Sequence, residues 1–432
     1  MKMRKPSKTE IPNYWLNPFS LLGVPPRFDK DGKYLAIENQ EEMFRAILLE
    51  KISDIIMGKE RKIEIPEGVR KELAKWRPTP LERARGLEKR LNLPENIRIY
   101  YKDESVSPSS THKSNAAVPQ AYYAVEEGLD AVYTIGQRGG NWFEAFFRAF
   151  SGKISSLRAY WVAGIGEERE RQMHRIGEWQ KKYAGVEVRL CPDEMTRAGI
   201  KALSEYQGKI VGKNVATAQA IEWMLDSSEK AKVIQGCSTI ELFQTIIGEE
   251  ASNQLAVEGI KPDIIVGCGG GSSTVGMAYP FIYDKWNSGG ELNGLRVIAV
   301  EDERCSPLSL LFPQNVPFEY TGNYLPQMLA YLLPEHNLST KIRASGVSGR
   351  LSHEVGSWMR MRGFIEPYVI SEETALNAQL IFQESEGITV YPETAYAVAG
   401  TIDLAQKYQR DKIPATILFC LTGGKKSNLF NW

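Results

Sequence analysis

The chain has 432 residues, which is long enough for two or three domains and a large buried core. Its 53 Lys and Arg residues balance 53 Asp and Glu residues, so net charge does not favour binding to nucleic acid or to an anionic membrane. The five cysteines have no paired spacing and only four histidines are present, so we predict neither a metal site nor a disulfide framework.

The N-terminus is basic, but no apolar segment of a signal peptide follows it. A run of about 18 apolar residues, the length that spans a membrane, occurs nowhere in the sequence. We therefore expect a cytoplasmic protein with reduced thiols and no membrane partner.

Residues 1–75 are predicted to form an N-terminal extension. Prolines punctuate its first part, and the segment 39–57 has the apolar spacing of a helix. The extension ends before the sequence RPTPL at 77–81, where two prolines fix φ and remove backbone donors. We therefore place a rigid turn there and expect a change of pattern after it.

Beyond residue 81, short β-branched or aromatic runs alternate with amphipathic segments. This alternation is typical of βαβ units and of an open, mostly parallel sheet. Seven or more strands are too many for one compact sheet with loops this long, so we predict an α/β protein with two lobes, each a twisted sheet with helices on both faces. The predicted strands are 97–102, 131–135, 157–162, 186–190, 263–266, 295–300 and 415–421, and the main predicted helices are 116–127, 167–183 and 239–258.

The division into lobes follows from this order. We expect residues 76–111 and 231–432 to form the larger lobe, and residues 112–230 to form a smaller, mobile lobe. In such proteins ligands bind at the carboxyl ends of the strands and between domains. We therefore expect the active site between the two lobes.

Lys113 stands in a turn between the strand at 97–102 and the helix at 116–127. Hydroxyl side chains and a histidine surround it in the sequence STHKSN at 110–115. A lysine in this setting is where a Schiff-base lysine would be expected. Taken alone, such a lysine is more often an ordinary surface residue, so the interpretation depends on the rest of the chain.

The sequence GCGGGSS at 267–273 follows a predicted strand and precedes a helical segment. Consecutive glycines let the backbone approach an anion, and a helix N-terminus offers free N–H groups. We interpret it as a phosphate-binding loop, with a tight turn between packed elements as the alternative. A dinucleotide site is less favoured, because no acidic residue stands about 20 positions further on at a second strand end.

Two further glycine-containing loops follow strands. In TIGQRGGN at 134–141, backbone amides and Gln137 are suited to a carboxylate and Arg138 to a second anion, although an ordinary βα loop is the alternative. The segment LTGGKKS at 421–427 does not meet the spacing of a P-loop, but its Thr422 could hydrogen-bond a ring nitrogen that stays unprotonated. A reactive lysine, a phosphate loop, a carboxylate loop and this hydroxyl are the parts needed for pyridoxal phosphate acting on an amino acid.

Seven motifs occur in one order along the chain: RPTPL (77–81), YYKDESVSPSSTHKSN (100–115), FQTIIGEE (243–250), GCGGGSS (267–273), IAVE (298–301), SEGITVYPETAYA (385–397) and LTGG (421–424). Together they resemble the tryptophan synthase β-chain, and more closely its divergent second class, which has a longer N-terminal extension. The resemblance implies a fold type II pyridoxal phosphate enzyme, a carbon-oxygen lyase of tryptophan biosynthesis.

The resemblance also implies a role for each matching residue. Lys113 would bind the cofactor covalently and shuttle the Cα proton, and Thr422 would face the pyridine nitrogen. A hydroxyl there keeps the ring neutral, which favours β-elimination and β-replacement. Thr134, Gly136 and Gln137 would hold the substrate carboxylate. The other expected cofactor contacts are His112, Asn115, Gly269, Gly270, Gly271, Ser272, Ser273 and Glu393, of which Glu393 is alternatively a helix N-terminal charge.

One position departs from the family pattern. The carboxylate loop of the family usually reads ETGAGQ, and its glutamate acts as acid and base on the serine hydroxyl and on indole. Here the loop is one residue shorter and Tyr133 takes the place of the glutamate. Hydroxide needs a proton donor in order to leave, and such catalysis is worth about 10²–10⁴-fold. Phosphate leaves without this help and Arg138 is suited to bind it, so we predict O-phospho-L-serine as the donor and indole as the acceptor.

Other interpretations stay open at this point. The donor could be L-serine, or the enzyme could resemble a cysteine synthase that uses sulfide or a dehydratase. A non-catalytic relative that binds amino acids is a further alternative, which requires Lys113 to be idle. We expect a homodimer, and the extension and the altered loop argue against association with a tryptophan synthase α-chain.

Overall fold

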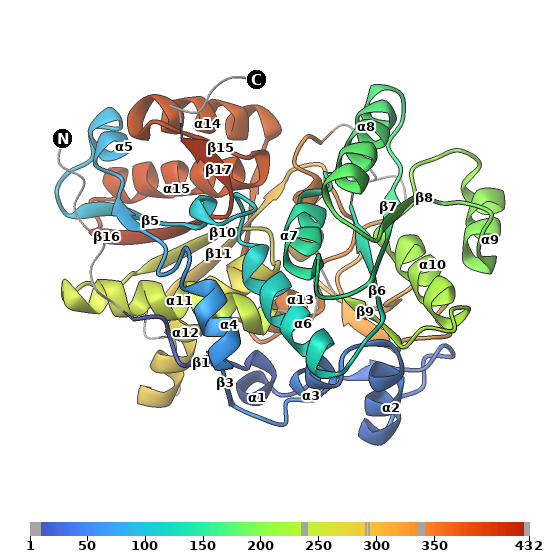
Figure 1. Cartoon of the computed structure of the whole chain (residues 1–432). Coiled ribbons are helices and arrows are strands. Elements are labelled where there is room, and N and C mark those ends of the chain that lie inside the picture. Colours follow the sequence, from blue (N-terminus) through green and yellow to red (C-terminus); the bar gives the residue numbers. More distant parts are fainter. Residues whose placement is uncertain are drawn as a thin grey trace.

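Figure 1 shows the computed structural model, which describes residues 10–137, 139–234, 241–289, 292, 294–334 and 342–426. Its larger sheet has six strands in the order β14-β11-β10-β16-β5-β4, and only the edge strand β4 runs antiparallel. The strands of this sheet are β4 (Leu81–Arg83), β5 (Ile97–Asp103), β10 (Ile264–Cys268), β11 (Arg296–Asp302), β14 (Glu366–Ile370) and β16 (Ala415–Leu421).

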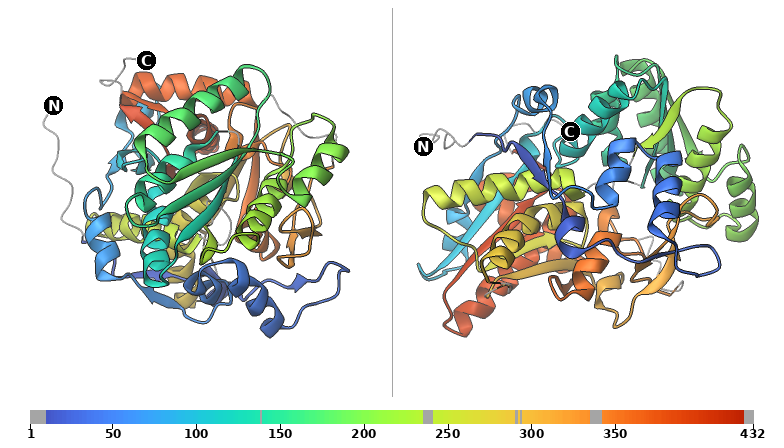
Figure 2. Two further views of the ribbon diagram at one scale, coloured as in Figure 1. Left: turned by 45° about the vertical axis from the view of Figure 1, so that its right-hand side comes forward. Right: turned by 90° about the horizontal axis from the view of Figure 1, so that it is seen from below.

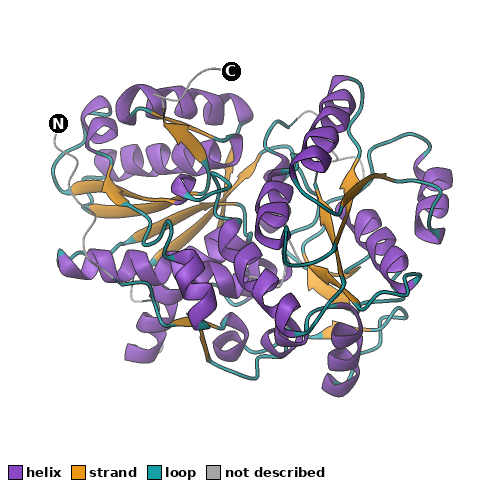
Figure 3. Ribbon diagram, viewed as in Figure 1, coloured by secondary structure: helices purple, strands orange, loops and turns teal. Residues whose placement is uncertain are grey.

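A second sheet of four parallel strands stands apart from the first (Figure 3). Its order is β8-β7-β6-β9, and its strands are β6 (Ala131–Gly136), β7 (Ser156–Val162), β8 (Val186–Cys191) and β9 (Ala231–Ile234). The predicted α/β architecture with two open, mostly parallel sheets is therefore confirmed. The expected end of the smaller lobe at residue 230 needs a correction, because β9 follows it and pairs with β6.

All seven predicted strands are present, with ends that differ by at most two residues. Central strands such as β10 and β16 are buried at nearly every position, because helices cover both faces of the sheet. Three strands of the two sheets, β4, β9 and β14, were not predicted from the sequence. All three lie at sheet edges and are partly exposed, so none forms a continuous apolar run.

Helices cover both faces of each sheet (Figure 1). On the larger sheet, α15 and α14 pack on one face and α12 and α11 on the other; on the smaller sheet, α10 and α9 pack on one face and α7, α6 and α8 on the other. These helices are α6 (Ser114–Glu126), α7 (Asn141–Phe150), α8 (Glu167–Lys182), α9 (Arg197–Tyr206), α10 (Lys213–Leu225), α11 (Glu241–Val257), α12 (Ser272–Gly289), α14 (Glu372–Glu386) and α15 (Pro392–Arg410).

The N-terminal segment runs along the base of both sheets, as the view from below shows (Figure 2). Its first strand contacts α11, and α4 contacts α6. The helix predicted over 39–57 is in fact two helices, because Leu48 between them is extended and forms a parallel bridge to Val233 at the edge of β9. The segment consists of β1 (Tyr14–Leu16), α1 (Pro18–Leu22), β2 (Arg27–Phe28), α2 (Ile37–Ile47), α3 (Glu50–Ile56), β3 (Lys62–Glu64) and α4 (Glu67–Leu73).

Smaller elements complete the chain. A three-stranded antiparallel sheet joins β2 to two later strands, and a two-stranded sheet closes the C-terminal end. The remaining elements are α5 (Arg85–Arg90), η1 (Glu104–Val106), η2 (Pro307–Ser309), β12 (Gln314–Pro317), β13 (Gln327–Ala330), η4 (Ser345–Val347), α13 (Glu354–Met361), β15 (Ile388–Val390) and β17 (Gly424–Lys426). Within the described ranges, no helix combines the length and the apolar character needed to cross a membrane.

The largest hydrophobic core is shared between the N-terminal segment and both sheets. Trp15 and Phe44 of the segment belong to the same cluster as Phe143 of α7, Phe243 of α11 and Val297 of β11. Two further clusters fill the outer faces, one under α14 and α15 and one under α9 and α10. The extension is therefore part of the main core and not a separate appendage.

This shared core predicts unequal effects of two neighbouring substitutions in β1. Trp15 is fully buried and its ring meets that of Phe243 edge-on at 4.8 Å, whereas Tyr14 is 47% exposed. Trp15→Ala should lower the free energy of unfolding by about 3–5 kcal/mol because it leaves a cavity. Tyr14→Ala should change it by less than about 0.5 kcal/mol. Denaturant unfolding of both variants measures the difference, and equal small effects would contradict a shared core.

Candidate active site

A cavity lies where the carboxyl ends of β6, β10 and β16 approach one another. This is the end of parallel sheets at which ligands bind. Both sheets contribute to its wall, together with loops before α6, α13 and α15. Its lining residues are Thr111, His112, Lys113, Ile135, Gly136, Gln137, Gly140, Asn141, Trp142, Cys268, Gly271, Ser272, Ser273, Ser345, Gly346, His353, Tyr391, Glu393, Thr422 and Gly423.

Lys113 immediately precedes α6 and its turn is attached to the end of β16. The His112 N–H donates to the Thr422 carbonyl at 2.9 Å, and Thr111 forms a bridge with Gly423. Gly423 is required for this contact, since a Cβ there would lie 2.7 Å from the Tyr391 ring. The turn therefore cannot move without displacing the last strand of the larger sheet.

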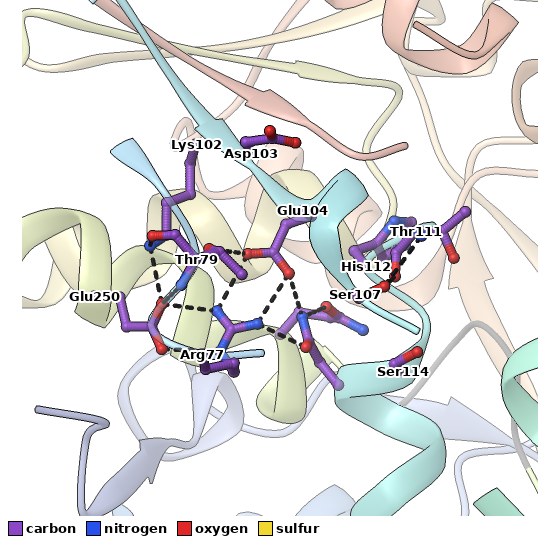
Figure 4. Close-up of polar contacts among 12 residues, drawn as sticks. Arg77, Thr79, Lys102, Asp103, Glu104, Ser107, Thr111, His112, Ser114 and Glu250 are labelled. Carbon is purple, nitrogen blue, oxygen red and sulfur yellow. Dashed lines mark hydrogen bonds and ion pairs between the residues drawn. The ribbon is translucent and has the colours of Figure 1, made fainter. Parts of the chain in front are cut away.

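A buried cluster of charges holds the other side of the turn (Figure 4). The Arg77 guanidinium pairs with Glu250 at 2.8 Å and with Glu104 at 2.9 Å, and it donates to the Asn115 amide oxygen at 2.7 Å. Lys102 pairs with Glu250 at 2.9 Å. The cluster consists of two cations and two anions whose side chains are fully buried, so its formal charge is balanced.

The charges of this cluster stabilise one another. Burial alone would raise the pKa of Glu104, but the adjacent Arg77 guanidinium holds it at about 2. Burial lowers the pKa of the Lys102 ammonium, which three oxygen acceptors surround. Asn115 donates to Glu104 at 2.8 Å and lies two residues after Lys113. The cluster therefore anchors the first turn of α6 and, with it, Lys113.

The glycine loop has the tight packing expected of a phosphate site. Gly269 adopts a positive φ of 61°, and its N–H donates to Val300 at 2.7 Å. A Cβ on Gly267 would lie 2.1 Å from Thr274 Oγ1, and one on Gly356 would lie 1.9 Å from the Gly270 carbonyl oxygen. The loop leads into α12, whose first residues Ser272 and Ser273 line the cavity, and a helix N-terminus of this kind can bind an anion.

Thr422, which directly follows β16, and Glu393, at the start of α15, also line the cavity. The Thr422 hydroxyl is 2.8 Å from the Thr394 hydroxyl, which fixes its direction. Glu393 is in the first turn of α15, as the alternative interpretation required, but it also lines the cavity and accepts hydrogen bonds from Ser345 and from the Gly346 N–H. Its charge therefore faces both the helix terminus and the cavity.

Two histidines line the cavity, and both are held neutral. Burial, followed by the charge of Lys113, lowers the pKa of His112 to about 3. Its Nδ1 is 3.3 Å from the Thr422 carbonyl oxygen, which can only accept, so the ring proton resides on Nδ1. Burial also lowers the pKa of His353 well below its ordinary value.

The structure brings most of the predicted site residues together. Asn115 is not among the lining residues, because its amide is used by the charged cluster. Thr134 is not exposed to the cavity either, since its hydroxyl donates to the Ile234 carbonyl and accepts from Trp142. Gly269 and Gly270 lie behind the wall, and Arg138 lies outside the described residues. The predicted residues that line the cavity are His112, Lys113, Gly136, Gln137, Gly271, Ser272, Ser273, Glu393 and Thr422.

Tyr133 does not replace the family glutamate in the cavity. Its side chain is fully buried within β6, its hydroxyl accepts a hydrogen bond from Arg158, and its ring packs edge-on against Trp223 at 5.4 Å. Arg158 in turn pairs with Glu229. The hydroxyl is therefore committed to a structural network away from the lining residues.

Sequence reasoning missed several lining residues. Ser345, Gly346 and His353 come from a segment without helical or strand periodicity, so no local signal indicated them. Tyr391 stood beside the predicted Glu393 but received no role. Arg77, Lys102 and Glu104 were within the quoted motifs, and only their contacts reveal what they do.

The chain matches the model of one protein family, described as "Pyridoxal-phosphate dependent enzyme", over residues 73–423. It is 33% identical to "Tryptophan synthase beta chain 2" of Thermotoga maritima over 430 residues, which cover 96% of this chain and 95% of the relative. It is also 33% identical to "Tryptophan synthase beta chain 1" of Sulfurisphaera tokodaii, with 99% of this chain and 97% of the relative covered.

Solved structures with the same fold are more distant in sequence. A serine racemase from maize has a TM-score of 0.54 and 15% identity and covers 83% of this chain and 94% of its own. An L-serine ammonia-lyase from Rhizomucor miehei has a TM-score of 0.53 and 16% identity, and the match covers 81% of this chain and 94% of the lyase chain. At this level of identity the likeness shows the fold alone.

From the charged cluster we predict that removing Arg77, its central cation, lowers the free energy of unfolding. Arg77→Met leaves Glu104 and Glu250 with only Lys102 as a charged partner, so the free energy of unfolding should fall by about 3–5 kcal/mol. The matched control is Arg90→Met, whose guanidinium is 61% exposed in a 3.5 Å pair with Glu384. Loss of such a surface pair should cost at most about 1 kcal/mol. Unfolding curves that shift equally for both variants would contradict the assigned role.

Glu301 predicts a pH dependence of stability. Its buried carboxyl accepts hydrogen bonds from Ser306 at 2.8 Å and from the Leu308 N–H at 3.1 Å, and Leu308 packs on Gly270 of the glycine loop. Burial raises its pKa from 4.5 to about 7. The folded state thus favours the protonated acid, and the resulting stability is present below pH 4.5 and is lost as the pH rises to about 7.

Glu301→Gln keeps both acceptor contacts and removes this titration. Its free energy of unfolding should rise relative to the unmodified protein by up to about 1.4 kcal/mol per pH unit across that window. Thermal unfolding at several pH values measures the difference, with Glu384→Gln, 66% exposed, as the control. A difference that stays constant with pH would show that Glu301 is ionised throughout.

Proposed function

Because this chain belongs to the family of pyridoxal-phosphate dependent enzymes and is a homologue of tryptophan synthase β chains, we propose that it makes L-tryptophan by β-replacement. Its cofactor is pyridoxal 5'-phosphate, and its class is that of a lyase. The acceptor in the proposal is indole, and the donor is a serine-type amino acid. The observation that carries the proposal is one cavity that combines Lys113, the glycine loop and the Thr422 hydroxyl.

The lining residues fit this cofactor. A primary amine is available at Lys113 for covalent attachment, and the start of α12 with Ser272 and Ser273 offers N–H and hydroxyl donors for a phosphate. Gly271 leaves room on the cavity side, since a Cβ there would meet nothing closer than the His353 ring at 3.6 Å. Thr422 supplies a neutral hydroxyl for a pyridine nitrogen.

When bound, the cofactor supplies an electron sink that acidifies the Cα–H bond of an attached amino acid. The protein supplies the rest of the chemistry. Gly136 and Gln137 hold the substrate carboxylate at the end of β6, next to the N-terminus of α7. The Lys113 amine takes the Cα proton and later returns it, and the charged cluster keeps that amine in place.

The donor in the proposal is O-phospho-L-serine. The carboxylic acid that the family uses on the serine hydroxyl is replaced by Tyr133, whose hydroxyl accepts from Arg158 away from the lining residues. Among the described lining residues only Glu393 carries a carboxyl group, and Ser345 and Gly346 hold it. A leaving group that needs no proton, such as phosphate, suits this arrangement better than hydroxide.

The proposed reaction eliminates phosphate and then adds indole. Lys113 removes the Cα proton, and the bond between Cβ and the phosphate oxygen breaks with its electron pair leaving on inorganic phosphate. Indole C3 then forms a bond to Cβ and releases its own proton, and Lys113 returns a proton to Cα. Indole and O-phosphoserine thus give tryptophan and phosphate. Binding of the departing phosphate by Arg138 stays a prediction.

Two other parts of the proposal concern assembly and location. We propose a cytoplasmic homodimer that works without a tryptophan synthase α-chain. The homodimer is proposed from the resemblance of the sequence motifs. The absence of an α-chain is proposed because of the N-terminal segment, which packs into the main core, and the altered carboxylate loop. A sulfide acceptor or simple dehydration is less favoured, because the relatives that match almost the whole chain are tryptophan synthase β chains.

The test compares the two donors with indole in steady-state assays of the holoenzyme. O-phospho-L-serine should give a kcat/KM at least about 10²-fold above that of L-serine, the lower value expected for an absent general acid. Lys113→Ala should abolish tryptophan formation from both donors. It should also abolish the visible absorbance band that borohydride removes.

Each outcome has a distinct meaning. Equal or better turnover of L-serine would overturn the donor assignment and keep tryptophan synthesis. Turnover of sulfide in preference to indole would replace the acceptor. An unmodified protein without the absorbance band would be a non-catalytic relative, and the proposal would fail as a whole.

A further inference from the structure

His353 has no role in the reaction described above, yet it lines the cavity at its phosphate end. It immediately precedes α13, and its neighbours in the cavity wall are Gly271, Ser272 and Ser273 at the start of α12. A Cβ placed on Gly271 would lie 3.6 Å from Nε2 and 3.7 Å from Cε1 of the ring. The Nε2 edge of the imidazole therefore lies beside Gly271 of the glycine loop.

The opposite edge of the ring faces a carboxylate. His353 Nδ1 is 3.8 Å from Glu241 Oε1, and the two side chains are 19% and 1% exposed. Among the residues that the structure describes, Nδ1 has no hydrogen-bond partner. A largely buried imidazole with a carboxylate behind it and the candidate phosphate site in front of it has the geometry of an oriented proton carrier.

The surrounding charges determine the state of the ring. Burial is the largest effect that lowers the pKa of His353, and Lys213 of α10 and Lys113 lower it further. Glu241 of α11 acts in the opposite direction, because a nearby carboxylate favours imidazolium. The neighbouring Glu354 is paired with Arg27 at 2.7 Å. Without an anion in front of it the imidazole is neutral, and a phosphate dianion would favour the imidazolium.

We propose that His353, oriented by Glu241, donates a hydrogen bond from Nε2 to the cofactor phosphate and takes up a proton from solvent when that phosphate binds. The inference rests on the family's cofactor and is independent of the donor and acceptor proposed above. It makes His353 a phosphate ligand in addition to the glycine loop and the N-terminus of α12.

The decisive comparison uses two cofactor forms that differ only in the phosphate. Apoenzyme is titrated with pyridoxal phosphate and with pyridoxal, and the visible absorbance band reports binding. His353→Gln keeps a polar side chain but cannot carry the proton. It should weaken pyridoxal phosphate binding about 10- to 100-fold, the effect of one hydrogen bond to a charged group, and leave pyridoxal binding unchanged.

The matched control is His174→Gln, since His174 is exposed on α8. It should bind both cofactor forms like the unmodified protein. Calorimetric titration in buffers of different ionisation enthalpy should show proton uptake with pyridoxal phosphate in the unmodified protein and in this control. His353→Gln should lose that uptake, and Glu241→Gln should reduce it, because the carboxylate no longer favours imidazolium.

The outcomes separate this inference from its alternatives. Equal losses of affinity for pyridoxal and pyridoxal phosphate in His353→Gln would show a purely structural role and overturn the proposal. Unchanged binding of both forms and unchanged proton uptake would overturn it as well. An effect confined to the KM of O-phospho-L-serine, with cofactor binding intact, would place His353 at the donor phosphate instead. The cofactor and calorimetric titrations require no turnover, unlike the KM measurement, so a failure of the proposed reaction would leave their interpretation unaffected.

Discussion

The position of Lys113, to which we assign the covalent attachment of the cofactor, depends on a buried cluster of four charges. Taking Arg77, Lys102, Glu104 and Glu250 out of water is costly, and such a cluster persists only where every charge has partners of good geometry. Here each carboxylate has a cation within 2.9 Å, and Thr79 and Asn115 fill further contacts. Because these residues come from the turn before β4, the end of β5, α6 and α11, one electrostatic arrangement fixes how four parts of the chain meet beside Lys113.

The phosphate end of the cavity is shaped by contact distances and not by charge. The close approaches at Gly267 and Gly356 leave no room for a Cβ, so Thr274 and α13 pack directly on the backbone of the glycine loop. Leu308 adds support from outside, and the buried Glu301 carboxyl holds its N–H. His353 enters the cavity from the residue before α13. The packing that shapes the loop therefore also places the imidazole that we assign to the phosphate.

In the altered carboxylate loop, the sequence reveals which residue is replaced but not where the new side chain points. The replacement of the family glutamate was visible in the sequence, and it is the reason that we propose a different leaving group. Only the structure showed that Tyr133 faces Arg158 and Trp223, and so offers no substitute acid. Thr134 and Asn115 also stand in motifs of the site, but their side chains make structural contacts. Thr134 accepts a hydrogen bond from Trp142. Asn115 is hydrogen-bonded to Arg77 and Glu104.

The sequence by itself determined the fold class, the seven main strands, and the places of Lys113, the glycine loop and Thr422. These features have local signals: apolar runs in buried parallel strands, and strand-to-helix turns with particular residues. The tertiary structure alone decided which side chains face the cavity, the pairing of β9 and β14 at sheet edges, and the approach of His353 to Gly271. Such contacts join residues far apart in the chain, and their direction depends on packing that no local pattern records.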